Sequence, residues 1–163
     1  MRQLGFTLLR ESGVKLSNKG RYGVRALFDM AFHGGGTSAQ IRDIAERQNI
    51  PARFLEQIFQ DLRRAGLVSS KRGPRGGYQL TRAAREITLA DILRALEGPL
   101  SAYAEEEPAA GDATSIAVTE AAFRDLGQKV ERCFEQVSLE DLCERAEELG
   151  VKRGTPGGYV YVI

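Results

Sequence analysis

GLVSSKRGPRGGYQL, at residues 66–80, has the pattern of a β-hairpin with a glycine-rich tip. Residues 67–71 and 78–80 alternate between apolar and polar side chains, which predicts two short strands around a glycine-rich turn at residues 72–77. Residues 41–65, just before this hairpin, predict two helices joined by a tight turn. Helix, turn, helix and hairpin in this order predict a winged helix-turn-helix, which is a mostly α fold with a small β wing.

The tip of the predicted wing is basic, since it carries Lys71, Arg72 and Arg75. A narrow cationic hairpin suits the anionic backbone of DNA and its minor groove, where shape is read more than sequence. The wing therefore favours a DNA-binding protein.

A further helix is expected ahead of the helix-turn-helix. Apolar side chains recur at spacings of three and four between Val24 and Ala31, which predicts a helix over residues 17–32. The three glycines at 34–36 would end it with a left-handed cap. Thr37 and Gln40 have the spacing of a capping box for the next helix.

The second helix of the helix-turn-helix is expected to run from about residue 51 to residue 65. Asn49 tolerates a left-handed turn before it, and Pro51 fits the first turn of a helix. We expect a buried face formed by Phe54, Leu55, Ile58, Phe59 and Leu62. The opposite face carries Arg53, Glu56, Gln57, Gln60 and Arg64.

Side chains near the N-terminus of a recognition helix read bases. Arg53 can bind a guanine edge, Gln57 can bind adenine, and Glu56 can accept a hydrogen bond from cytosine N4. The other candidates are expected to contact backbone phosphates, although a solvated surface charge is the alternative for any one of them. These candidates are Lys19, Arg21, Gln60 and Arg64.

The second half of the chain is predicted to be helical. It should contain a short helix at 88–97, an acidic exposed loop at 99–115, a long helix at 116–136, a last helix at 138–149 and a strand at 157–163. The long helix repeats apolar side chains at 3-4-3-4 spacing, which predicts a dimerisation seam, with packing on the same chain as the alternative. The seam consists of Phe123, Leu126, Val130, Cys133 and Val137.

Charge divides the chain into two unlike halves. Residues 15–85 hold fourteen Lys or Arg and five Asp or Glu, a net +9, whereas residues 86–163 hold seven and sixteen, a net −9. A basic half joined to an acidic half indicates one nucleic-acid face and one part that stays off the DNA. We therefore expect an N-terminal extension at 1–13, a DNA-binding domain at 14–85, and a dimerisation and effector region at 86–163.

Several classes of protein are disfavoured. No run of about 18 apolar residues marks a membrane span, and the N-terminus is too short and polar for a secretory signal. Two cysteines do not make a disulfide scaffold, so a cytoplasmic location is expected. No nucleotide-binding loop and no nucleophile with an adjacent base is evident, so the chain is not expected to be an enzyme.

These residues resemble the Rrf2 family of winged-helix bacterial transcription regulators, which includes the IscR, CymR and NsrR types. The resemblance implies a homodimer that binds a palindromic operator, with Arg53, Glu56 and Gln57 facing bases and Arg72 in the minor groove. It is carried by LSNKGRY at 16–22, FLEQ at 54–57, AGLV at 65–68, RGPRGGY at 72–78 and ITL at 87–89.

The chain departs from the cluster-sensing members of that family. Those members carry three cysteines in the loop before the long helix, with a histidine, or an acidic residue of helix one of the partner, as fourth ligand. Here residues 99–117 contain neither Cys nor His, Glu120 stands near the histidine position, and Arg21 stands near the acidic one. Thiolates and imidazoles hold Fe–S clusters, so we expect no cluster and no cofactor.

The sequence thus predicts a homodimeric, sequence-specific regulator, with repression as the expected activity. An effector protein or small molecule would act through the acidic half. Two alternatives stay open: a redox sensor that uses an atypical cluster or the thiols of Cys133 and Cys143, and a winged helix that binds protein instead of DNA. Two small buried side chains are the simpler interpretation of the cysteines.

Overall fold

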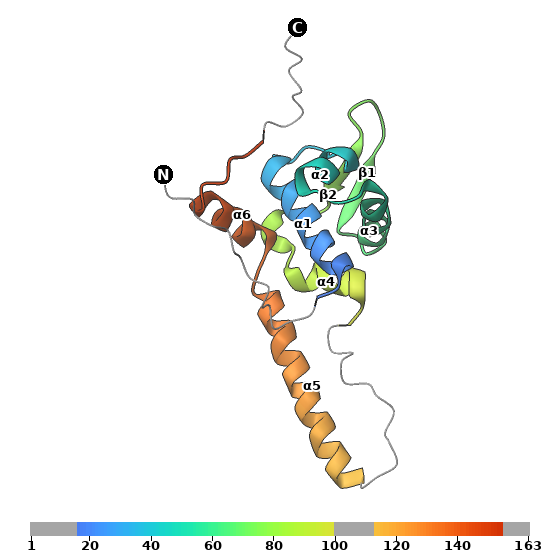
Figure 1. Cartoon of the computed structure of the whole chain (residues 1–163), viewed down its shortest axis with the longest axis vertical. Coiled ribbons are helices and arrows are strands. Elements are labelled where there is room, and N and C mark those ends of the chain that lie inside the picture. The colour runs from blue at the N-terminus through green and yellow to red at the C-terminus, as the bar shows by residue number, and fades with distance from the viewer. Residues whose placement is uncertain (1–15, 100–112, 155–163) are drawn as a thin grey trace.

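A central helix, α1 (Asn18–His33), organises the fold, and four other helices and one strand of the wing pack against it (Figure 1). The computed structural model describes residues 16–99 and 113–154. It is mostly helical, with one two-stranded sheet, as predicted. The other elements are α2 (Ile41–Gln48), α3 (Ala52–Arg64), β1 (Val68–Lys71), β2 (Gly77–Leu80), the 3-10 helix η1 (Ala84–Glu86), α4 (Leu89–Glu97), α5 (Ala113–Glu135) and α6 (Leu139–Glu148).

Side-chain caps explain where three helices begin. Ser17 accepts a hydrogen bond from the backbone N–H of Gly20 at the start of α1, and Thr88 and Ser138 form capping boxes for α4 and α6. Such caps bind backbone N–H groups that have no partner within the helix. The predicted box at Thr37 and Gln40 is wrong, because the Thr37 hydroxyl donates back to Gly34 O (2.5 Å) and Gln40 makes no side-chain cap.

The core lies where α1, α3 and α4 meet under the wing. Leu27, Ile44, Leu55, Phe59 and Ile92 are fully buried there. The helices α1 and α4 pack closely because α1 presents Gly20 and Gly23 to α4. A Cβ atom at Gly23 would collide with the side chain of Leu96, so the small residue permits this approach.

Two details of α3 differ from expectation. The expected burial of Phe54 is wrong, because it lies at the edge of the apolar face and 55% of it is exposed. Its ring makes an edge contact with that of Tyr22, at 6.4 Å between centroids. Pro51 is the N-cap residue and precedes the first turn instead of forming part of it. Asn49 adopts the predicted left-handed conformation, with φ of 49°.

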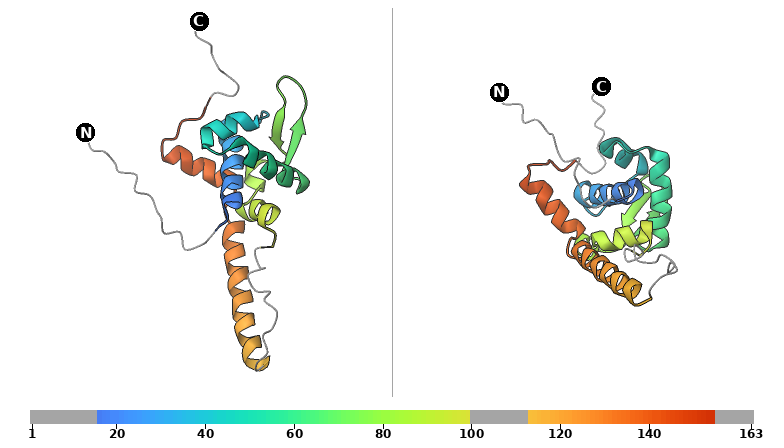
Figure 2. Two further views of the ribbon diagram at one scale, coloured as in Figure 1. Left: turned by 45° about the vertical axis from the view of Figure 1, so that its right-hand side comes forward. Right: turned by 60° about the horizontal axis from the view of Figure 1, so that its bottom comes forward.

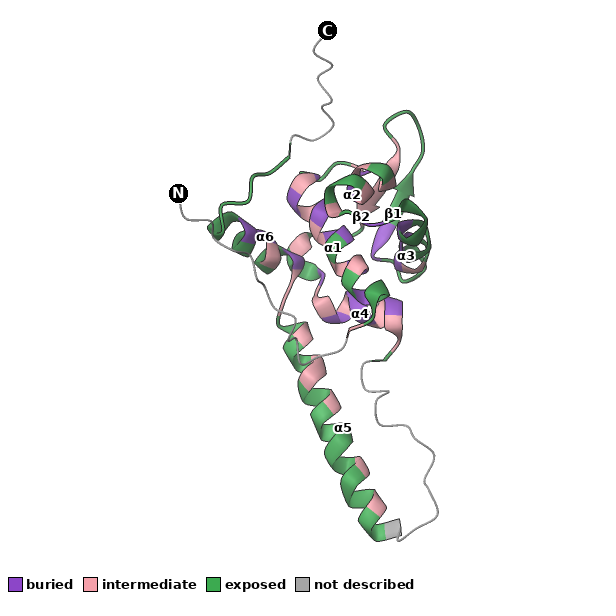
Figure 3. Cartoon of the chain, viewed as in Figure 1, coloured by how far each residue is buried: buried purple, intermediate pink, exposed green. Residues whose placement is uncertain are grey.

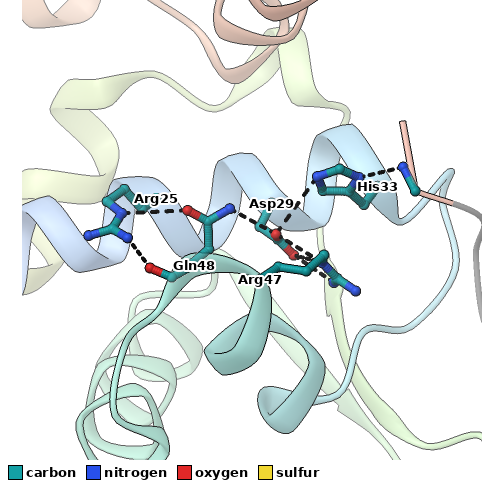
Figure 4. Close-up of polar contacts among 6 residues, drawn as sticks. Arg25, Asp29, His33, Arg47 and Gln48 are labelled. Carbon is teal, nitrogen blue, oxygen red and sulfur yellow. Dashed lines mark hydrogen bonds and ion pairs between the residues drawn. The ribbon is translucent and has the colours of Figure 1, made fainter. Parts of the chain in front are cut away.

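A buried carboxylate joins α1 to α2 (Figure 4). Asp29 is 0% exposed and accepts hydrogen bonds from Arg47 Nε (3.0 Å), Arg47 Nη2 (2.7 Å) and Gln48 Nε2 (2.9 Å). Arg25 in turn donates to the backbone carbonyl of Gln48. A buried charge is tolerated only when it is paired and hydrogen-bonded, and this one is both.

The helix α5 extends away from the rest of the molecule, and most of its surface is exposed (Figure 3). Arg94 of α4 binds it near its C-terminal end, through Glu131 (2.7 Å) and Glu135. The helix ends at Glu135, so Val137, the last residue of the predicted seam, lies beyond it, and its carbonyl accepts from Leu89 N (2.8 Å).

Two sequence expectations fall outside the described residues, namely the extension at 1–13 and the strand at 157–163. Most of the expected loop at 99–115 also lies outside them, and its residues 113–115 belong to α5 instead. Of the helices that are described, none combines the length and apolar character needed to cross a membrane.

We predict that Asp29→Asn lowers the free energy of unfolding by about 2–3 kcal/mol. The amide would keep one acceptor oxygen but would turn an NH₂ group toward a donor of Arg47 or Gln48, and it would remove the charge that pairs with Arg47. Equilibrium denaturation by urea measures the change. Asp125→Asn, an exposed position on α5, should stay within about 0.5 kcal/mol of the parent. Equal stability of the two variants would contradict a structural role for Asp29.

Candidate nucleic-acid interface

The helix-turn-helix consists of α2, the left-handed turn at Asn49, and α3. The backbone N–H of Asn49 closes α2 on Ala45 O and Glu46 O, and the buried Ile50 then turns the chain into α3. The buried side of α3 consists of Leu55, Ile58, Phe59 and Leu62, which leaves the opposite side open to solvent. All five polar residues predicted on this open side are exposed, namely Arg53, Glu56, Gln57, Gln60 and Arg64.

The wing is an antiparallel hairpin in which Val68 pairs with Leu80 and Lys71 with Gly77. A third segment extends it, since Ala39 N donates to Tyr78 O (2.9 Å) and Tyr78 N donates to Ala39 O (2.8 Å). Tyr78 also packs against Phe59 of α3, with ring centroids 4.7 Å apart. The wing is therefore attached both to the recognition helix and to the segment that leads into α2.

The wing tip holds its cations in solvent. Lys71, Arg72 and Arg75 are all exposed, and Gly73 turns the chain between them with φ of 116°. Ser38 donates a hydrogen bond to the backbone carbonyl of Arg75 (2.7 Å), which connects the far side of the turn to the segment before α2. These contacts limit how the hairpin can swing relative to α3. The hairpin and α3 lie next to each other on one side of the molecule (Figure 2).

Two predicted phosphate contacts are paired within the protein. Lys19 Nζ lies 2.6 Å from Asp61 Oδ2, and Arg64 Nη1 lies 2.8 Å from Asp61 Oδ1. The carboxylate of Asp61 thus connects the first turn of α1 to the last turn of α3. Arg21, in the first turn of α1, is exposed.

The sequence interpretation missed the residues around the start of α2. An open cleft lies between α2 and the wing. Arg42 lines this cleft together with Lys71 and Arg75, and Asp43 and Glu46 add acidic groups to it. The position of Arg42 in the first turn of α2 could have suggested a DNA contact, but only the fold places it across from the wing.

The described residues do not fit a metal cluster. No group of three or more His, Cys, Asp or Glu side chains among them could hold a metal ion. The two cysteines of the chain differ in setting: Cys133 is exposed on α5, whereas Cys143 is buried in α6, where burial raises the pKa of its thiol. His33, the single histidine, accepts from Gly154 N through Nδ1 (2.7 Å). Fe–S clusters need several thiolates, and residues 100–112 contain no Cys.

Known proteins resemble this chain over most of its length. The Rrf2 family, described as iron-dependent transcriptional regulators, matches residues 16–145. The regulator IscR of Xenorhabdus nematophila is 38% identical over 152 residues, which cover 89% of this chain and 93% of that protein.

Two solved structures match as well. IscR of T. potens has a TM-score of 0.69 at 37% identity, covering 87% of this chain and 95% of that one. CymR, the global cysteine regulator of B. subtilis, has a TM-score of 0.67 at 34% identity, covering 81% and 98%. The names of these proteins agree with the expectation that the chain is not an enzyme.

We predict that Arg72→Ala weakens binding to duplex DNA by about 1–3 kcal/mol, because the wing tip would lose a cation that contacts the backbone or the minor groove. Gel-shift titration at one fixed salt concentration measures the loss. Arg132→Ala removes the same charge from α5, away from the wing, and should leave affinity nearly unchanged. The wing assignment fails if the two variants bind equally well.

Proposed function

The chain belongs to the Rrf2 family of transcriptional regulators, and on this basis we propose that it is a homodimeric operator-binding repressor that works without an Fe–S cluster. The observation that carries the proposal is the surface formed by the open side of α3 and the basic wing. Residues 14–85 would form the DNA-binding domain, and residues 86–163 would hold the dimer together and receive an effector.

The open side of α3 supports direct reading of bases. Arg53 and Gln57 lie one helical turn apart near the N-terminus of α3, and Glu56 lies beside them. Such a side of a helix enters the major groove, where each base pair shows a distinct pattern of donors and acceptors. Arg72 and Arg75 would then meet the neighbouring minor groove, so one docking position uses both elements.

The exposed apolar face of α5 supports the homodimer. Phe123 and Leu126 are 58% and 57% exposed, and Val130 and Cys133 continue their spacing along the helix. Large apolar side chains that gather on one exposed face mark an interaction site more often than scattered ones do. A second copy of α5 offers the same face, which is what a twofold interface requires.

Repression without a cluster follows from what the chain offers. A dimer bound across an operator can exclude polymerase by occupancy alone, so repression needs no further contact surface. The thiol and imidazole inventory of two cysteines and one histidine falls short of the ligands of a typical cluster. We propose that the input comes from a partner protein or a small molecule that binds the acidic half.

A thiol-sensing regulator is the second candidate, and the exposure of Cys133 favours it. This thiol lies on the face of α5 that we assign to the dimer, so its oxidation would alter that interface. Burial argues against a similar role for Cys143. If oxidant changes DNA affinity in the parent but not in Cys133→Ser, this candidate replaces the effector-driven one.

We predict that Leu126→Glu converts the dimer to a monomer and weakens operator binding by at least tenfold, since two half-sites bind together only when the subunits are joined. Light scattering after size exclusion gives the oligomeric state. Gln128→Glu adds the same charge at an exposed position of α5 outside the apolar series and should remain dimeric. A parent protein that is already monomeric would refute the dimer.

We further predict that selection from a random duplex pool yields a palindromic site, with affinity that falls steeply as salt rises. Protein purified without oxygen should show no visible absorbance of a cluster and no stoichiometric iron. Visible bands with bound iron would favour an atypical cluster. Lack of affinity for every duplex at low salt would favour a protein-binding winged helix.

A further inference from the structure

We propose that Asp61 competes with DNA phosphates for Lys19 and Arg64 and thereby limits binding to non-specific DNA. This inference rests on the proposed DNA-binding function and adds a residue that restrains it. The two cations come from different helices, α1 and α3, and reach the same carboxylate, one on each oxygen, at 2.6 and 2.8 Å.

Lys19, Asp61 and Arg64 lie at the edge of the open side of α3, which we propose reads DNA. Arg64 continues the open side of α3 that begins at Arg53, at spacings of three and four residues through Gln57 and Gln60. Its side chain is 76% exposed, and that of Lys19 is 44% exposed, so both can be reached by a phosphate group. The side chain of Asp61 is less exposed than either cation, at 21%.

Asp61 can compete with phosphate for Lys19 and Arg64 because its carboxylate is charged. The hydrogen bond from Lys19, supported by the charges of Lys19 and Arg64, lowers the pKa of Asp61, so the carboxylate is ionised at neutral pH. A phosphate that binds either cation must share it with this carboxylate or displace it, and the two anions also repel each other. Non-specific binding depends almost entirely on contacts between cations and phosphates, so it is the mode that such competition weakens most.

The test uses Asp61→Asn in the full chain and a duplex of about 30 base pairs of arbitrary sequence. We expect the variant to bind this duplex about three- to tenfold more tightly at low salt. The slope of log K against the logarithm of salt concentration should become more negative by about one to two. Each newly available cation that binds a phosphate displaces about 0.9 counterions from the DNA. Thermal melting confirms that the variant is folded, and Asp61→Ser should reproduce the gain if the asparagine side chain perturbs the helix.

The same substitution in a variant that lacks both cations tests whether Asp61 acts by competing for them or merely by its negative charge. In Lys19→Met with Arg64→Met, the two cations are absent, so Asp61→Asn should bring no gain. A gain of equal size in this background, or an equal gain from Asp125→Asn on α5, would overturn the proposal. So would unchanged or weaker binding by Asp61→Asn. If the parent itself binds no duplex at low salt, it is the DNA-binding function that fails.

Discussion

The pairing of Asp29 with Arg47 and Gln48 is the constraint on which the DNA-reading geometry depends. Asp29 lies fully buried in α1, and its two partners from α2 are the last two residues of that helix. Since α2 is followed after three residues by α3, this carboxylate helps to position the start of the recognition helix. The contacts of Ala39 with Tyr78 then attach the wing to the same unit. One buried charge thus helps to fix three elements that must meet a duplex together.

Acidic residues have opposite roles in the basic half of the chain. Residues 15–85 contain only five of them against fourteen basic ones. Asp29 stabilises the fold by pairing with Arg47 of α2. Asp61 binds two cations at the edge of the open side of α3. The net charge of a domain therefore overstates how many of its cations meet DNA, because some of them are held by carboxylates of the same domain.

The elements of this fold could be predicted well from the sequence because their signals are local. Helix spacing, Asn49 and the glycine-rich hairpin all act within a few residues, whereas the capping box predicted at Thr37 and Gln40 does not form. Interactions between elements could not be predicted this way. Asp29 stands 18 residues from Arg47, and Lys19 stands 42 residues from Asp61. Phe54 shows the same limit, since it borders the buried face of α3 and helical spacing alone does not tell whether another element covers it. Residue type and position indicate the candidate DNA contacts, whereas the fold shows which of them form ion pairs within the protein.

The backbone bridge between Thr88 and Ser138 has a consequence for the whole assembly. Leu89 N binds Val137 O, and Leu139 N binds Ile87 O, so the starts of α4 and α6 are tied together at the base of α5. The long helix is therefore held rigidly at one end by the domain that carries the reading surface. In a pair of subunits joined through α5, the distance between the two recognition helices would be set by this stiff arm. The number of base pairs separating the halves of the operator would then be a property of helix geometry, and lengthening α5 by one turn would change it.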